Sequence, residues 1–230
     1  AYSRSAHKAE RIAAKIQQQG KSCVPCTKLE DLLALKPDYL VEAASPAAMK
    51  ELALPTLKNG TSIITLSIGA LVDTVFYNAV IEASRANGTR VYIASGATGG
   101  FDVLRTASLM GNASAKFFNE KGQHALRRSV VYDPSLETEQ RVVFSGTARE
   151  AIGVFPTGLN VSVATSLASV GPEQMHVTMQ STPGFIGDTQ RVEIRNDQVH
   201  AVVDVYSATS EIAGWSVVST LQNIVSPIVF

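Results

Sequence analysis

The stretch that decides the fold is Arg90-Val91-Tyr92-Ile93-Ala94-Ser95-Gly96-Ala97-Thr98-Gly99-Gly100, an apolar strand predicted over residues 90–94 that runs into a series of small residues. Two earlier strands, over residues 39–43 and 62–67, have the same character. Helices are predicted around them, over residues 6–19, 29–35, 47–57 and 72–86. Strands that alternate with helices at this spacing indicate βαβ units. Because the strands are continuous apolar runs, helices are expected on both faces of a parallel sheet.

The second half of the chain has a different pattern. Short alternating segments predict an antiparallel or mixed sheet, and they cover residues 128–132, 142–145, 176–180, 191–195 and 200–206. Further helices are predicted over residues 148–155, 160–168 and 214–224. The predicted fold class is therefore α/β, a doubly wound parallel sheet, followed by an α+β domain with a mixed or antiparallel sheet.

Composition excludes several classes of protein. The 230 residues are 45% apolar and 17% charged, which is typical of a globular protein. Twenty basic residues balance twenty acidic ones, so neither a nucleic-acid partner nor an anionic membrane is expected. No apolar run is long enough for a membrane helix. Cys23 and Cys26 lack the further ligands of a zinc site, so we interpret residues 22–26 as a short strand and predict no metal. Two cysteines give no disulfide framework, which favours the cytoplasm.

Five motifs, taken in order along most of the chain, carry a resemblance to a known family. They span residues 38–46, 66–73, 95–102, 142–151 and 155–161. The chain resembles the L-aspartate dehydrogenase family in these motifs. The resemblance implies a small-molecule substrate, namely L-aspartate oxidised to iminoaspartate with NAD or NADP, or the reverse reaction. It also implies a homo-oligomer, a dimer or a tetramer.

The resemblance implies a division of the chain into three parts. Residues 1–95 are expected to form a Rossmann-type NAD(P)-binding domain that lacks its first strand and glycine-rich turn. Residues 96–212 are expected to form the α+β domain with the catalytic and dimerisation surfaces. Residues 213–230 are expected to form a helix that packs back on the first domain.

Small residues at three successive strand ends predict a shared crevice, because ligands of such sheets bind beyond the carboxyl ends of the strands. The alternative is that each is only a βα turn. Ala97 and Asn160 match family positions that contact the nicotinamide, and Asn160 is equally suited to capping its own helix. Further cofactor contacts are predicted at Ala44, Ser45, Ser67, Gly69 and Ala70. Substrate contacts are predicted at Ser95, Gly96, Thr98, Gly99 and Gly100.

No glycine-rich phosphate loop occurs in the sequence. Either the chain binds no dinucleotide, or it starts after that loop, and the strand end Ala1-Tyr2 favours the second explanation. Family members begin with a strand, a glycine-rich turn and a helix. Ser3, Arg4 and Ser5 then stand where an acidic residue binds the ribose in NAD-specific proteins. A guanidinium and two hydroxyls suit a 2′-phosphate, so NADP is predicted over NAD. A solvated N-terminal arginine is the alternative.

The catalytic histidine of the family has no counterpart. Gln190 stands at its position, and an amide positions a substrate but does not move protons. His200 is the alternative base, with weaker claims for His124 and His176. Lys121 is suited either to binding a carboxylate or to a solvated position. Two functions stay open: an NAD(P)-dependent dehydrogenase acting on CH–NH2 or a related group, and a catalytically silent binding or regulatory protein.

Overall fold

A three-stranded parallel sheet forms the first half of the computed structural model, which describes residues 1–155 and 158–230. Its strands are adjacent in chain order, β1 (Tyr39–Glu42), β2 (Ser62–Thr65) and β3 (Val91–Ile93). The first helices are α1 (Ala6–Gln17), α2 (Leu29–Ala34), α3 (Pro46–Lys58), the 3-10 turn η1 (Ile68–Val72) and α4 (Thr74–Asn87). The βαβ prediction is confirmed, with boundaries that differ by a few residues.

Local signals fix where these helices begin and end. Ser45 caps α3, since its hydroxyl accepts a hydrogen bond from the Ala48 N–H at 3.1 Å. Asp73 caps α4 in the same way through Val75 and Phe76. Gly88 ends α4 in the left-handed conformation, with φ of 63°. The end of β1 therefore leads directly into a capped helix, whereas β2 leads into the 3-10 turn η1 before the capped helix α4.

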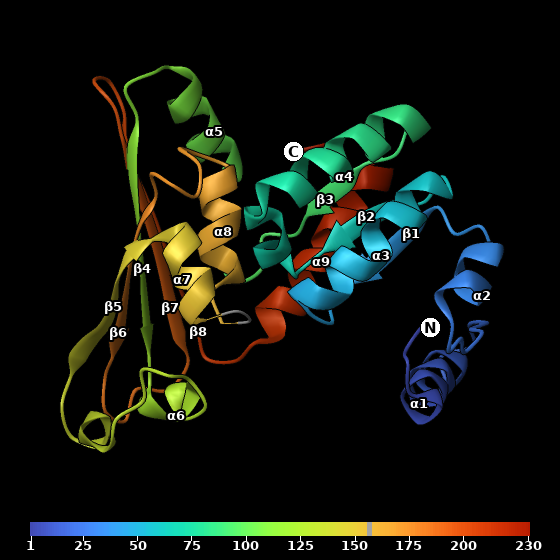
Figure 1. Ribbon diagram of the computed structural model, residues 1–230, viewed down its shortest axis with the longest axis horizontal. Helices are drawn as coiled ribbons and strands as arrows, with labels where there is room; N and C mark the ends of the chain where they lie inside the picture. Colours follow the sequence, from blue (N-terminus) through green and yellow to red (C-terminus); the bar gives the residue numbers. More distant parts are fainter. Residues whose placement is uncertain (156–157) are drawn as a thin grey trace.

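Helices cover both faces of this sheet. Ile63 on β2 packs into a core that contains Met49 of α3 and Val80 of α4. The next residue, Ile64, points to the opposite face and packs with Val217. Val217 belongs to α9 (Glu211–Val225), the red C-terminal helix that lies against the first sheet in Figure 1. The last helix thus returns from the second half of the chain to the first.

The second half forms a five-stranded mixed sheet in the order β5-β6-β4-β7-β8. Its strands are β4 (Ser114–Lys121), β5 (Arg141–Thr147), β6 (His176–Ser181), β7 (Asp188–Arg195) and β8 (His200–Ser207). Its helices are α5 (Phe101–Leu109), α6 (Gln123–Leu126), the 3-10 turn η2 (Pro134–Glu137), α7 (Ala148–Val154) and α8 (Asn160–Leu167). In Figure 1, α5, α7 and α8 lie on the side of this sheet that faces the first half. Val163 of α8 reaches the first core.

Three sequence expectations for local structure differ from the structure. Residues 22–26 form no strand, and only Cys26 makes a single bridge, to Tyr2. Residues 128–132 form turns instead of a strand. The alternation over β4 was not predicted, because its inward-facing positions include the polar residues Asn119 and Lys121. Pro156 and Thr157, which belong to one of the five motifs, lie outside the described residues. Within the described ranges, no helix has the length and apolar character needed to cross a membrane.

Candidate active site

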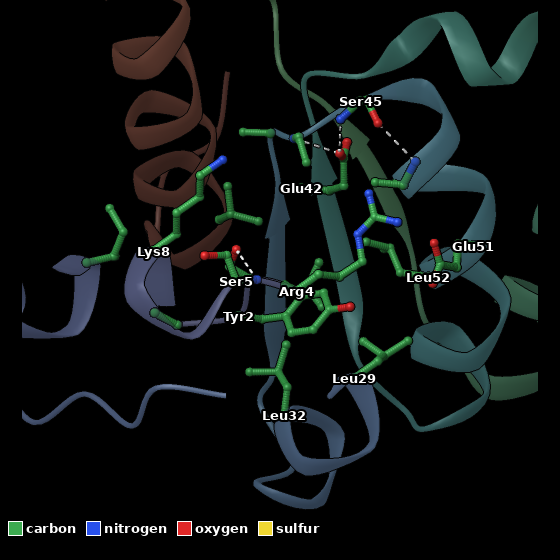
Figure 2. A pocket seen from close by; sticks show the side chains of 18 residues that line it. Tyr2, Arg4, Ser5, Lys8, Leu29, Leu32, Glu42, Ser45, Glu51 and Leu52 are labelled. Carbon is green, nitrogen blue, oxygen red and sulfur yellow. Dashed lines mark hydrogen bonds between the residues drawn. The ribbon is translucent and has the colours of Figure 1, made fainter. Parts of the chain in front are cut away.

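A wide cavity of about 760 Å³ lies beside the edge of β1 and is lined by Tyr2 and the residues around it. Five predicted cofactor residues line this cavity together: Ser3, Arg4, Ser5, Ala44 and Ser45. Figure 2 shows this cavity from close by. The structure therefore brings the N-terminal Ser-Arg-Ser sequence to the end of β1, and of the three strand ends only this one lines the wider cavity.

The charged side chains around this cavity are two cations and the carboxylates of Glu42 and Glu51. Arg4 and Lys8 both line it, and in Figure 2 the Arg4 guanidinium lies on the side of Ser45 and Glu51. Neither cation forms an ion pair with another residue in the described part of the chain. Ser5 occupies the N-cap position of α1, and its side chain does not cap the helix. A helix N-terminus with two uncommitted cations attracts an anionic group.

A buried carboxylate holds the loops after β1 and β2 together. Glu42 is 2% exposed and accepts hydrogen bonds from the backbone N–H groups of Ala44 and Ser45. It also accepts from the hydroxyls of Thr65 at 2.8 Å and Ser67 at 3.0 Å. Ser67, a predicted cofactor residue, is thus engaged in fixing the loop. Glu42 organises the carboxyl edge of the sheet and was not singled out in the sequence.

A second cavity, of about 410 Å³, lies where the two halves of the chain meet. Leu66, Ile68 and Val161 form its apolar wall. The predicted residues Gly96, Ala97, Asn160 and Gln190 line it as well. This cavity therefore contains both residues that the resemblance assigns to the nicotinamide and the residue at the family's catalytic position.

Asn160 ties the second cavity to the loop after β2. Its side-chain oxygen accepts a hydrogen bond from the Gly69 N–H at 2.8 Å. A Cβ on Gly69 would lie 3.0 Å from the same oxygen, which is a tight contact, so glycine favours this close approach. Leu159, not Asn160, occupies the N-cap position of α8. The Asn160 amide thus crosses between the two halves of the chain at the edge of the cavity.

The register of β4 against β7 places four polar side chains on one face. Lys121 pairs with Asp188 and Asn119 with Gln190 in this antiparallel ladder. The Asp188 carboxylate accepts hydrogen bonds from Asn119 and, at 2.7 Å, from Gln190. Lys121 Nζ lies 3.3 Å from Asp188 Oδ2 and donates to the Gly158 carbonyl. An ordered network of amides and charges therefore faces the cavity.

Three acceptors in this network are left open. Gln190 Oε1, Asn119 Oδ1 and Ser207 Oγ are buried and have no hydrogen-bond partner among the described residues. Gln190 itself is 2% exposed and lines the cavity. Because its Nε2 donates to Asp188, the amide orientation directs Oε1 away from that carboxylate. Buried unpaired acceptors are costly, so Gln190 Oε1, whose residue lines the cavity, is available to a hydrogen-bond donor placed there.

The remaining predicted site residues lie elsewhere. Ala70 is buried in the first core. Four predicted substrate residues line neither of the two cavities: Ser95, Thr98, Gly99 and Gly100. Gly100 has a positive φ of 70° at the start of α5, where a Cβ would meet Val203 at 2.5 Å. These residues form the connection between the two halves of the chain.

The histidines lie away from the cavity. His200 begins β8 at the far end of the hairpin from Gln190, and its Nε2 lies 3.0 Å from Glu193. His176 contacts Ser145, and His124 lies beside Gln123 in α6. None of these three histidines lines the second cavity, so a ligand held in that cavity would not contact them. The described residues contain no cluster of three or more His, Cys, Asp or Glu side chains suited to a metal ion.

Asp188 was not singled out from the sequence, and for Lys121 the sequence allowed either a carboxylate-binding role or a solvated position. Both line the second cavity, and they are the only charged side chains among its described lining residues. Neither had a clear signal in the sequence, because Lys121 ends a strand whose apolar alternation is broken and Asp188 precedes the strand expected over residues 191–195. Pairing those two strands in register was needed to bring the two charges together.

Two family models match consecutive parts of the chain. The model described as homoserine dehydrogenase, NAD binding domain, matches residues 3–94. The model described as aspartate dehydrogenase, C-terminal, matches residues 102–224. The second match alone spans more than half of the chain, and the two together cover the N-terminal sheet and the five-stranded sheet.

Curated relatives and solved structures agree with the family models. The L-aspartate dehydrogenase 2 of Bordetella bronchiseptica is 32% identical over 205 residues, covering 85% of this chain and 77% of that protein. An L-aspartate dehydrogenase of Methanococcus maripaludis is 28% identical, covering 88% and 79%. The aspartate dehydrogenase structure from Thermotoga maritima has a TM-score of 0.72 at 29% identity, covering 84% and 78%. The resemblance and the predicted fold class are confirmed, and the chain belongs to the aspartate dehydrogenase family of NAD(P)-dependent oxidoreductases.

Proposed function

We propose that the protein transfers a hydride between NADP and the α-carbon of an amino acid, or the corresponding imine, in the second cavity. The observation that carries the proposal is the composition of that cavity. Asn160 and Ala97 lie in it beside an apolar wall, together with Lys121, Asp188 and Gln190. A flat nicotinamide fits the apolar and amide side, and a small polar substrate fits the charged side.

The residues of both cavities suit the cofactor. Asn160 and Ala97 would orient the carboxamide of the nicotinamide, and Gly96 beside them has a φ of 66°, which residues with a side chain rarely adopt. Ala44 and Ser45 would line the path toward the wider cavity, with the loop held by Glu42. When bound, the cofactor supplies the hydride acceptor or donor.

The preference for NADP over NAD rests on the charges of the wider cavity. Arg4 and Lys8 face it without ion-pair partners in the described chain, and Ser3 and Ser5 add hydroxyl groups. A 2′-phosphate on the adenosine ribose would gain charge-assisted hydrogen bonds from these groups, and a bare 2′-hydroxyl would not. Calorimetric titration with NADP and NAD in parallel measures this preference.

The proton balance assigns a role to Asp188. Oxidation removes a hydride from the α-carbon and one proton from the ammonium nitrogen, which leaves an iminium group. Gln190 has no titrating group, and we assign it the role of positioning the substrate nitrogen through Oε1. Asp188 is the carboxylate that touches Gln190 and receives the proton. In the reverse direction the same carboxyl returns it.

The assay that tests this function measures NADP reduction with a panel of amino acids. Turnover that falls in Asp188→Asn and persists in His200→Gln supports the assignment, because His200 lies outside the cavity. Tight NADP binding without turnover on any amino acid or imine would instead favour a silent binding protein on the same scaffold.

We also propose a homo-oligomer, a dimer or a tetramer, formed through the open face of the five-stranded sheet. This face exposes Val142, Val202 and Tyr206, which are 51%, 41% and 59% exposed. Apolar side chains on an uncovered sheet face favour association. Light scattering of the purified protein measures the oligomeric state.

We propose the cytoplasm as the compartment, because the two cysteines do not form a disulfide with each other.

A further inference from the structure

The loop after β3 carries two residues that line the second cavity, Gly96 and Ala97. Gly96 has a φ of 66°, and no side chain restricts its torsion angles. The backbone at this point is therefore freer than a loop that has to place a flat nicotinamide ring beside a substrate. A contact from outside the loop is needed to hold it in one conformation.

Ser216 of α9 makes that contact. The Gly96 N–H donates a hydrogen bond to Ser216 Oγ at 3.0 Å, in a buried position, although the two residues are 120 positions apart in the chain. The hydroxyl in turn donates its one hydrogen to the Ala213 carbonyl at 2.7 Å. Its lone pairs are therefore left for the Gly96 N–H. Ser216 is only 8% exposed, so the contact is shielded from water.

α9 is itself anchored where this loop begins. Val217, the residue after Ser216, packs in a small core with Ile64 of β2 and Ala94. Ala94 directly follows β3, and its N–H donates to the Thr65 carbonyl at 3.2 Å. The apolar contact holds the helix against the sheet, and the Ser216 hydroxyl holds the loop against the helix.

The same helix also reaches the substrate side of the cavity. Ser210 and Ala213, at the start of α9, line the second cavity, as do Ser207 and Thr209 just before the helix. One rigid element therefore contacts the cavity at its first turn and the loop after β3 at its second. Hydride transfer depends steeply on the approach of the two reacting carbons, and a displacement of about 1 Å can slow a reaction about hundredfold.

We infer that Ser216 is a positioning residue, which sets the place of the nicotinamide relative to the substrate by holding the Gly96 N–H. This inference rests on the proposed function and adds to it a residue that contacts neither reactant. Ser216 lines neither of the two cavities. An effect of Ser216 on hydride transfer therefore passes through the loop after β3.

Two substitutions in α9 separate this role from helix stability. Ser216→Ala removes the hydroxyl and keeps the helix, because alanine has the highest helix propensity. Thr220→Val is the matched control, since the Thr220 hydroxyl donates to the Ser216 carbonyl at 2.8 Å and its bond stays within α9. Ser216→Ala loses a bond of that kind and the contact with Gly96, so the difference between the variants isolates that contact.

The affinity for NADPH is measured by calorimetry, and the rate of hydride transfer is measured in a single turnover with saturating NADPH. We expect Ser216→Ala to weaken NADPH binding about tenfold and to slow the transfer about tenfold or more, and Thr220→Val to change neither. A purely structural role would lower the denaturation midpoints of both variants to a similar extent and leave NADPH affinity and transfer rate unchanged. That result would overturn the inference.

The outcomes for the inference and for the proposed function are separable. NADPH binding without hydride transfer in the original protein would count against the proposed function alone. The NADPH affinities of the two variants would then decide, because a loss confined to Ser216→Ala supports the inference and equal affinities overturn it. Turnover at the same rate in the original protein and in Ser216→Ala would leave the proposed function intact and overturn the inference. Absence of NADPH binding in the original protein would overturn both.

Discussion

Lys121 Nζ lies 3.3 Å from Asp188 Oδ2 across the antiparallel pair of β4 and β7. Because the two residues lie on adjacent strands, the register of the sheet determines where this ion pair stands. Asn119 and Gln190, one step further along the same ladder, donate to the same carboxylate. A rigid sheet therefore positions the polar side of the cavity, and the loops of the first sheet position the apolar side.

Lys121→Met removes the cation and keeps much of the side-chain volume. We expect kcat/KM for the best amino acid to fall about tenfold to hundredfold, with NADPH affinity unchanged. Lys121→Arg should restore part of the activity. Lys116→Met is the control, because Lys116 lies on the same strand and pairs with Glu193. Equal losses in both methionine variants would argue against a substrate-binding role.

Asn160→Ala removes the acceptor of the buried Gly69 N–H. We expect the free energy of unfolding to decrease by about 1–2 kcal/mol, because a backbone donor loses its partner. The dissociation constant for NADP should rise about tenfold if Asn160 also orients the carboxamide. Chemical denaturation and calorimetry measure the two effects separately. Lost stability with unchanged cofactor affinity would reduce Asn160 to a structural residue.

Arg4→Leu tests the phosphate contact of the wider cavity. We expect NADP affinity to fall about tenfold while NAD affinity stays unchanged, because only NADP carries the 2′-phosphate. Raising the salt concentration should weaken NADP binding in the original protein and have less effect in the variant. Arg11→Leu in α1 is the control, since Arg11 does not line the cavity. An unaltered ratio of NADP to NAD affinity in Arg4→Leu would contradict this contact.

Glu42→Ala leaves four hydrogen-bond donors at the strand ends without their acceptor. We expect the free energy of unfolding to decrease by about 3 kcal/mol, as for other broken buried networks. Glu51→Ala, an exposed residue of the same cavity, should change it by less than about 0.5 kcal/mol. Urea denaturation of both variants provides the comparison. Similar midpoints for the two would show that Glu42 does not hold the loops.

Glu137 gives the fold a defined acid sensitivity near α6. Hydrogen bonds from Gln123, Arg127 and Tyr132 lower the pKa of its carboxyl from 4.5 to about 2. A lowered folded-state pKa stabilises the fold above the unfolded value, and that stability is lost as the pH falls through the folded value. We therefore expect stability to decline between about pH 4.5 and pH 2, and Glu137→Gln to flatten that decline. Parallel slopes for both proteins would exclude this contribution.

The parallel sheet was predictable because its signals are local. The apolar runs of β1 to β3 and the cap Ser45 are contained in short windows of sequence, whereas the predicted helix over residues 72–86 missed the cap Asp73 by two residues. The strand β4 was not predicted, since its inward positions end in Asn119 and Lys121 and break the apolar alternation. Residues 128–132 alternate like a strand but have no partner edge and form turns instead.

The candidate site was predictable only in part, for a related reason. The three strand ends were expected to share one crevice, and they line two cavities: Ala44 and Ser45 line the wider one, and Gly96 and Ala97 line the second. The contact of Asn160 with Gly69 and the pairing of Lys121 with Asp188 join residues far apart in the chain. Such contacts depend on strand order and register, which single segments do not specify. His200 had the right chemistry, and its place in the hairpin put it at the far end.

The most direct measurement follows a single hydrogen. Amino acids that include L-aspartate are each labelled with deuterium at the α-carbon and incubated with the protein and NADP. We expect the deuterium of at least one of these amino acids to appear on the nicotinamide ring of the reduced cofactor, and the transfer to fall in Asp188→Asn. Bound cofactor with no deuterium transferred from any labelled amino acid would contradict it.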